Sequence, residues 1–419
     1  MSQEAMNKLI AALKTGAGLT DEFIYSMPFD DYKALADPFP RTRVMVQEVQ
    51  ESIRRYPNPE RPGELFRWEI HGRLFTPLKV SIPDMAVVMI HGGAANEYEF
   101  IFTPDGPEEY PDLSKSDPRK ARIGVAQHIA SLGIPVLALS LPGHYSRKAW
   151  PPIEQRRPEF IIGQIPSDEE LRNRLAVYTF RMCTEAVKAL VEKALTQRCF
   201  MWGHSTGGEY FYLMEQFGLK NRLLGGLGFG TGMPAWVRKE WDLSCAEKSP
   251  EERAAQFRGL TELSRRSPKG YAKSGYMGPN QPWGTAEKWF ELENHRRPQF
   301  KPFLQDIEHS AHDVLIPEIK KVSGLPDDEL FITYKSDLNR LRGKKLLHIV
   351  GEYDKGHWIE GAKHGLPYRR EVYAFKKFKP YADALRLVIV PKLTHYGHVE
   401  SYNEGLANIM VTGFKEYFT

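Results

Sequence analysis

The feature that most constrains this chain is the pentapeptide Gly-His-Ser-Thr-Gly at residues 203–207, which directly follows the apolar run 199–202. The run is typical of a short buried strand, and the residues from Glu209 onward favour a helix. A Gly-x-Ser-x-Gly sequence between a strand and a helix indicates a sharp turn that strains the serine and leaves its side chain accessible. We therefore predict that Ser205 is a nucleophile. The alternative is an ordinary glycine-rich turn.

The strand before Ser205 is one of several short apolar runs that alternate with helical patterns. The runs that predict buried strands are 86–90, 136–139, 199–202, 223–229, 346–350 and 387–390. Helices are predicted at 123–131, 209–217 and 406–418, and by the apolar stripe Leu171, Leu175, Tyr178, Met182, Ala186, Leu190 and Ala194. Strands that alternate with helices predict an α/β chain with a doubly wound, mostly parallel sheet. Functional sites form at the carboxyl ends of the strands in such sheets.

Two further groups of polar residues follow the last two predicted strands. Gly-Glu-Tyr-Asp at 351–354 comes after the run 346–350, and Thr-His-Tyr-Gly-His at 394–398 comes after the run 387–390. With a serine, then an acid, then a histidine in chain order, the sequence resembles the α/β-hydrolase superfamily, in particular its serine esterases with a cap insertion. The resemblance covers a majority of the chain.

The resemblance implies a Ser-His-Asp triad. Asp354 is the expected acid because of its Gly-x-x-Asp setting after a strand, and Glu352 is the second choice. His395 is the expected base if Val390-Pro391 ends the last strand. The competing alignment takes Gly397-His398 as the catalytic pair, and the histidine that is not the base would then lie behind it or in the substrate pocket.

The same resemblance implies an oxyanion hole and a substrate pocket. Backbone N–H groups of Gly93 and Thr206 are expected to hold the oxyanion, since glycine lets the backbone approach a substrate oxygen closely. A plain turn at residues 91–93 is the alternative. The residues expected to contact substrate are His204, Tyr98, Trp236 and His398.

The domain division follows from the segments that exceed a minimal fold of this kind. We expect an N-terminal extension at 1–63, a hydrolase core at 64–232 and 341–419, and a cap or lid insertion at 233–340 that is rich in aromatic residues. The extension opens with an amphipathic pattern at Met6, Leu9, Ile10 and Leu13. This pattern favours docking on the body or on a partner subunit over lying on a membrane surface, because it is short and weakly basic.

Composition excludes several other classes of protein. The formal net charge is +4 over 419 residues and no basic tract is interleaved with aromatics, so no nucleic-acid partner is expected. We expect a cytoplasmic protein without membrane contact, since neither a signal peptide nor a membrane-spanning run is apparent. The three cysteines, Cys183, Cys199 and Cys245, do not form a disulfide framework.

Cofactors and metals are not expected either. The chain has no glycine-rich phosphate motif. Its liganding residue types between Glu352 and His364 lack a recognised metal spacing, and glycines interrupt the helix that would align them. The partner we expect is a small-molecule substrate, and a homodimer is compatible with the sequence.

These observations predict a serine hydrolase that cleaves a carboxylic ester of a small to medium apolar or aromatic substrate through an acyl-enzyme. The same triad serves amide, thioester and carbon–carbon bond hydrolysis, and the sequence does not separate them. A non-catalytic binding protein with a hydrolase fold is the alternative from another class.

Overall fold

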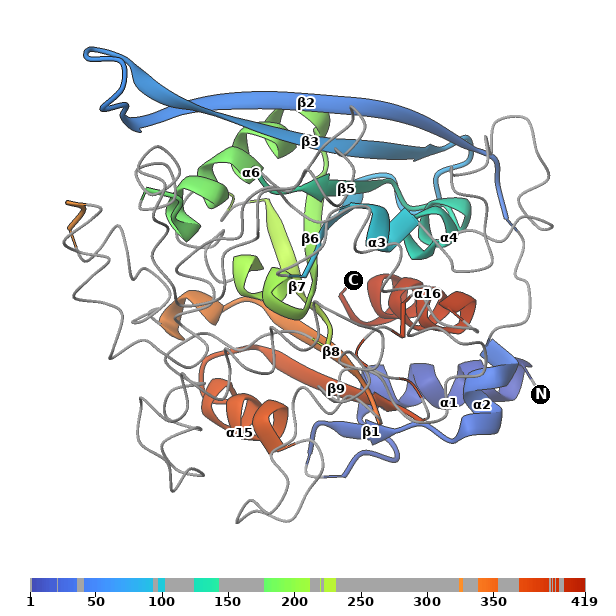
Figure 1. Ribbon diagram of the computed structural model, residues 1–419. Helices are drawn as coiled ribbons and strands as arrows, with labels where there is room; N and C mark the ends of the chain where they lie inside the picture. The colour runs from blue at the N-terminus through green and yellow to red at the C-terminus, as the bar shows by residue number, and fades with distance from the viewer. Residues whose placement is uncertain are drawn as a thin grey trace, which may run out of the picture.

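The structure is a computed structural model (Figure 1). It describes residues 2–20, 22–35, 41–92, 97–101, 124–142, 177–211, 219, 222–230, 324–326, 338–352, 369–391, 393, 395, 397–398 and 403–418. Most of the predicted cap at 233–340, including Trp236, lies outside these residues.

The described strands form one sheet in the order β1-β9-β8-β7-β6-β4-β5-β3-β2. Their bounds are β1 (Ile24–Ser26), β2 (Val44–Pro57), β3 (Leu65–Pro77), β4 (Met85–Ile90), β5 (Val136–Ser140), β6 (Arg198–His204), β7 (Leu223–Phe229), β8 (Lys345–Gly351) and β9 (Ala384–Val390). Neighbouring strands are parallel from β1 through to β5, and β3 pairs antiparallel with both β5 and β2. The predicted doubly wound, mostly parallel sheet is confirmed.

Both faces of the sheet are covered at its central strands, which explains why these strands appear in the sequence as unbroken apolar runs. The helices are α1 (Ser2–Thr15), α2 (Phe29–Leu35), α3 (Tyr98–Ile101), α4 (Val125–Ser131), α6 (Phe180–Ala194), α15 (Arg369–Phe378) and α16 (Asn403–Thr412), which continues as a π-helical turn at Gly413–Tyr417. Along β4, Val88 and Ile90 enter the hydrophobic cluster that contains α6 and α15 residues. Val87 and Met89 enter the cluster with α4 and α16 on the opposite face (Figure 1).

All six predicted strands are present, and most helix predictions agree with the structure. The helix before the nucleophile strand begins later than its apolar stripe suggests, at Phe180, because the Thr179 side chain caps it by accepting a hydrogen bond from the Met182 N–H. Tyr178 therefore precedes the helix, although it is buried as expected. Of the helix predicted at 209–217, the described part is Glu209–Phe211, which is helical.

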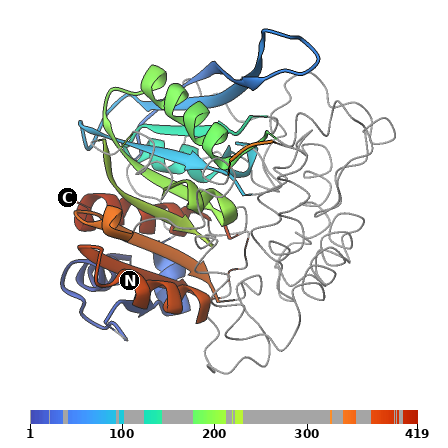
Figure 2. The same ribbon diagram turned by 90° about the vertical axis from the view of Figure 1, so that its left-hand side faces the viewer.

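The first 63 residues supply both edge strands of the sheet. β1 pairs with β9 at one edge, and β2 pairs with β3 at the other. Helix α1 buries Leu9 and Leu13 completely, and the carbonyl oxygens of Ala12 and Leu13 accept hydrogen bonds from Arg386 of β9 at 3.1 and 3.0 Å. Figures 1 and 2 both place the N-terminal helices beside α16. The amphipathic N-terminal helix thus docks on the body of the molecule.

Among the helices of the described residues, none combines the length and the hydropathy that crossing a membrane demands.

Candidate active site

The turn that joins β6 to the following helix is built around Ser205. The strand ends at His204, a 3₁₀ turn spans Ser205–Gly208, and Ser205 has a φ of +50°. An L-residue in this left-handed region costs about 1–2 kcal/mol, so the conformation requires support from its surroundings. His204 and Thr206 are buried, whereas Ser205 is partly exposed.

The two glycines of the pentapeptide make that turn sterically feasible. A Cβ at Gly203 would lie 2.1 Å from the Gly208 nitrogen, and a Cβ at Gly207 would lie 2.1 Å from the carbonyl oxygen of Ile90. The strand β6, the turn after it and the neighbouring strand β4 therefore lie too close together for a side chain at either glycine. A strained nucleophile elbow on a parallel sheet requires such close packing. The chain has the α/β-hydrolase fold.

In this fold, the loop after β4 lies directly against the elbow. A Cβ at Gly92 would lie 3.3 Å from the Cβ of Ser205. The preceding His91 is fully buried and holds the loop: its Nδ1–H donates to the Gly92 carbonyl oxygen at 2.7 Å, and its Nε2 accepts from the Leu141 N–H at 3.0 Å. Burial lowers the pKa of His91 to about 4, so the ring is neutral at pH 7.

A buried pair connects this loop to the elbow. Glu99 of α3 places Oε1 3.1 Å from Nδ1 of His204, and the same oxygen accepts the Gly92 N–H at 2.9 Å. On its other side, Nε2–H of His204 donates to the backbone carbonyl oxygen of His395 at 2.8 Å. Glu99 and His204 are each 2% exposed. One imidazole therefore links the segments that carry Glu99, Ser205 and His395.

The two candidate bases, His395 and His398, both lie beside His204. Their ring centroids are 4.7 and 4.2 Å from that of His204, and both side chains are buried. Burial, and after it the neighbouring rings of His204 and His395, lowers the pKa of His398 well below its ordinary value. His398 also contacts Phe100 and Phe229, with centroid distances of 5.8 and 5.9 Å.

The structure thus brings Ser205, Thr206, His204, His395 and His398 to one end of the sheet. Among the described residues, it records no hydrogen bond between the Ser205 hydroxyl and either candidate base. Catalytic hydrogen bonds are often long before substrate binds. The missing bond therefore does not decide whether His395 or His398 is the base.

The remaining predicted site residues are not placed. Gly93, Asp354 and Trp236 lie outside the described residues, as does the side chain of Tyr98, whose backbone begins α3. Of the residues between 352 and 364 that we considered as metal ligands, only Glu352 is described.

The sequence analysis missed Glu99. Its carboxylate lies 105 residues before His204 in the chain, so no spacing relates the two. The one available signal was an acidic residue among apolar neighbours, in the sequence Tyr-Glu-Phe-Ile at 98–101. Next to Glu99, the Glu97 N–H donates a hydrogen bond at 3.0 Å to the buried hydroxyl of Ser140, which ends β5.

Comparisons with known proteins give remote similarities in structure alone. No protein-family model and no curated protein matches the chain. Among solved structures, it is similar to an esterase from Exiguobacterium antarcticum, with a TM-score of 0.47, 11% identity, and coverage of 83% of this chain and 96% of that one. It is also similar to the peroxisomal α/β-hydrolase Lpx1 from Saccharomyces cerevisiae, with a TM-score of 0.45, 12% identity and 90% of each chain covered. A third similar structure is an epoxide hydrolase from metagenomes of hot environments, with a TM-score of 0.45, 14% identity, and 81% and 93% covered.

Proposed function

We propose that this chain is a serine hydrolase that cleaves a carboxylic ester, with Ser205 as the nucleophile. The observation that carries the proposal is the strained, partly exposed Ser205 between buried neighbours. Strain of this kind persists where the surrounding structure enforces it and is concentrated at functional sites. Among the residues that the structure describes, the Ser205 hydroxyl has no recorded hydrogen bond that would explain it, whereas acyl transfer requires a hydroxyl.

In the proposed reaction, a histidine removes the Ser205 proton as the oxygen attacks the ester carbonyl. The backbone N–H groups of Thr206 and Gly93 stabilise the tetrahedral oxyanion, and loss of one such donor typically costs about 2.7–4 kcal/mol. The protonated histidine gives its proton to the leaving alcohol. Water activated by the same histidine then releases the acid, while Asp354 holds the imidazole in the required tautomer.

His395 is the proposed base. A general base is most effective when its pKa lies near the working pH, and the pKa of His398 lies well below its ordinary value. The hydrogen bond from His204 to the His395 carbonyl also fixes the His395 backbone relative to the residue that precedes Ser205. His398 is therefore better suited to a role that requires a neutral imidazole.

The proposed substrate is a small or medium apolar or aromatic ester. Support comes from the sequence, through the aromatic residues of the cap insertion and of the segment that begins at Tyr98. His204 is proposed as a residue that supports the elbow, since both of its ring nitrogens face protein atoms.

Turnover of p-nitrophenyl esters of graded acyl length tests this proposal. We expect hydrolysis by the wild type, none above background by Ser205→Ala, and wild-type rates for the control Ser52→Ala on the edge strand β2. Retained turnover in Ser205→Ala would remove the nucleophile assignment. Absence of turnover on every ester would contradict the ester assignment and turn attention to amide, thioester and carbon–carbon substrates.

A further inference from the structure

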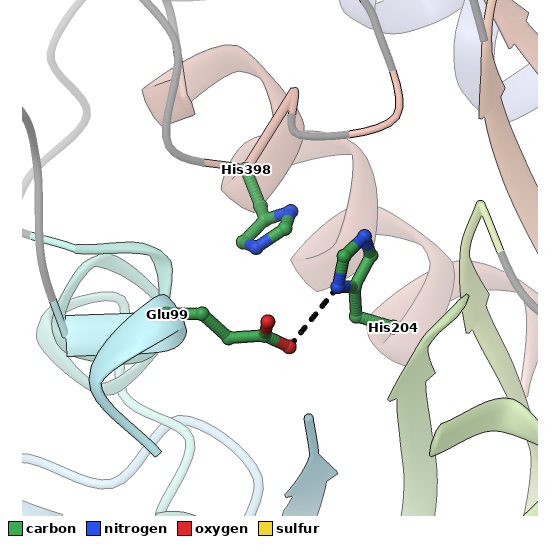
Figure 3. A group of neighbouring side chains, drawn as sticks. All are labelled: Glu99, His204 and His398. Carbon is green, nitrogen blue, oxygen red and sulfur yellow. Dashed lines mark hydrogen bonds and ion pairs between the residues drawn. The ribbon is translucent and has the colours of Figure 1, made fainter. Parts of the chain in front are cut away.

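Three buried side chains from distant parts of the chain converge at the end of β6 (Figure 3). Glu99 comes from α3, His204 from the end of β6, and His398 from the turn region after β9. One oxygen or nitrogen atom of each side chain lies within 4.8 Å of the other two. Each residue is 2% exposed. The cluster combines two imidazole nitrogens with a carboxylate oxygen.

The hydrogen bonds around the cluster fix which ring nitrogen of His204 faces Glu99. The His395 carbonyl can only accept, so Nε2 of His204 carries a proton, and Nδ1 is the nitrogen that faces Glu99. In the absence of a metal, a proton has to lie between Nδ1 and Oε1, and a cation would replace that proton.

The outer contacts of the cluster are those typical of metal ligands. Histidine ligands commonly donate their second N–H to a backbone carbonyl, and ligating carboxylates are themselves hydrogen-bonded. His204 makes such a bond to His395, and Glu99 Oε1 accepts the Gly92 N–H. These contacts fix the orientation of two of the three side chains before any ion arrives.

The second carboxylate oxygen of Glu99 supplies an independent observation. Oε2 is buried and has no hydrogen-bond partner among the described residues. Figure 3 shows it on the side of the carboxylate that faces His398. A buried carboxylate oxygen without a partner is costly, and a cation at the centre of the cluster would offset that cost.

We propose that Glu99, His204 and His398 bind a Zn²⁺ ion. Imidazole and carboxylate ligands suit zinc, which is bound at about 2.0–2.2 Å by these atoms, so the set closes on an ion with side-chain movements of about 1 Å. The ion would cross-link the loop after β4, the elbow and the C-terminal histidine turn. The site does not include Ser205, and the proposal holds whether or not the chain is an esterase.

No metal was expected from the sequence, because a metal motif is recognised by the spacing of ligands that are close together in the chain. The ligands of this site meet only because β4 and β6 are neighbours in the sheet and the turn after β9 returns to the same end. A metal site assembled in this way has no local spacing to detect.

The test is metal titration of the chelator-treated full-length chain. Co²⁺ added stepwise is expected to bind once per chain, with the strong visible absorption of a four-coordinate Co²⁺ ion, and one equivalent of Zn²⁺ should abolish the signal. Glu99→Gln, which keeps the shape and an acceptor for Gly92, and His398→Phe should each weaken binding by more than the roughly 10- to 100-fold that loss of an outer partner of a metal ligand typically costs. The control His348→Gln removes a buried histidine of β8 outside the cluster and should bind as the wild type does.

A second measurement separates metal binding from folding. Zn²⁺ should raise the Tm of the wild type and of His348→Gln, but not that of His398→Phe. If Glu99→Gln fails to fold, the wild-type stoichiometry and His398→Phe decide the question. Absence of one-to-one binding in the wild type, or binding that survives His398→Phe, would overturn the proposal.

Discussion

The Nε2–H of His204 donates to the backbone carbonyl oxygen of His395 at 2.8 Å, so the residue before the candidate nucleophile anchors the residue proposed as its base. The other nitrogen of the same ring faces Glu99, which also holds the Gly92 N–H. A single buried imidazole therefore determines how three segments at the carboxyl end of the sheet lie relative to one another.

Replacing that imidazole should destabilise the whole site. His204→Phe keeps the ring volume but leaves the Glu99 carboxylate buried without its partner, which should cost about 3–5 kcal/mol in the free energy of unfolding. Urea denaturation measures the loss. The double variant His204→Phe/Glu99→Met removes both polar groups and should be markedly more stable than the sum of the two single losses predicts. Additive losses would show that the pair is not coupled.

The φ of +50° at Ser205 predicts a gain in stability from glycine. Ser205→Gly relieves the left-handed strain, and after the entropy cost of glycine it should be about 0.5–1 kcal/mol more stable than Ser205→Ala. Neither variant has the hydroxyl, so the comparison isolates the backbone. Equal urea midpoints for the two variants would contradict the strained conformation.

The glycines at 203 and 207 should tolerate no side chain. Gly207→Ala places a Cβ 2.1 Å from the Ile90 carbonyl oxygen, a backbone atom in the centre of the sheet that cannot move aside. We expect a loss of several kcal/mol, on the scale of the most damaging core substitutions, or failure to fold. Gly63→Ala is the control, since it has positive φ but nothing within 4 Å, and it should cost about 1–2 kcal/mol. Similar Tm values for the two variants would contradict the close packing of the elbow.

The central strands could be predicted from sequence because burial on both faces turns each of them into an apolar run, as at 223–229. The outer strands could not be predicted in this way. Most residues of β2 (Val44–Pro57) are partly or fully exposed, and charged residues such as Glu48 and Arg54 interrupt its apolar alternation. An edge strand that faces water carries no strong apolar signal, so its pairing with β3 appears only in the structure.

For the candidate site, the local part was predictable and the long-range part was not. The elbow is encoded in five consecutive residues, so its strained serine and its close glycines follow from one motif. The Glu99–His204 pair depends on the register between β4 and β6, in which Ile90 aligns with Gly203. No pattern along the chain specifies that alignment.

The two described cysteines, Cys183 and Cys199, are buried, and burial raises the pKa of their thiols to about 12 and about 11. In a Cys245→Ser background, a thiol-specific disulfide reagent at pH 8 should label the native chain negligibly and label both cysteines after unfolding.

Because the folded pKa values of Cys183 and Cys199 lie above the unfolded ones, the stability from these neutral thiols is fully present below about pH 9 and falls as the pH rises towards 11–12. Urea midpoints at rising pH check the sign, and rapid labelling of the native chain would contradict the burial.

The most direct test of the account is covalent labelling with a fluorophosphonate, which reacts with activated serines, followed by mass mapping of the modified peptide. The account predicts one adduct per chain, located on Ser205, and none on Ser205→Ala. A native, folded chain that takes up no label, or that carries its label on another residue, would contradict the assignment of Ser205 as the nucleophile.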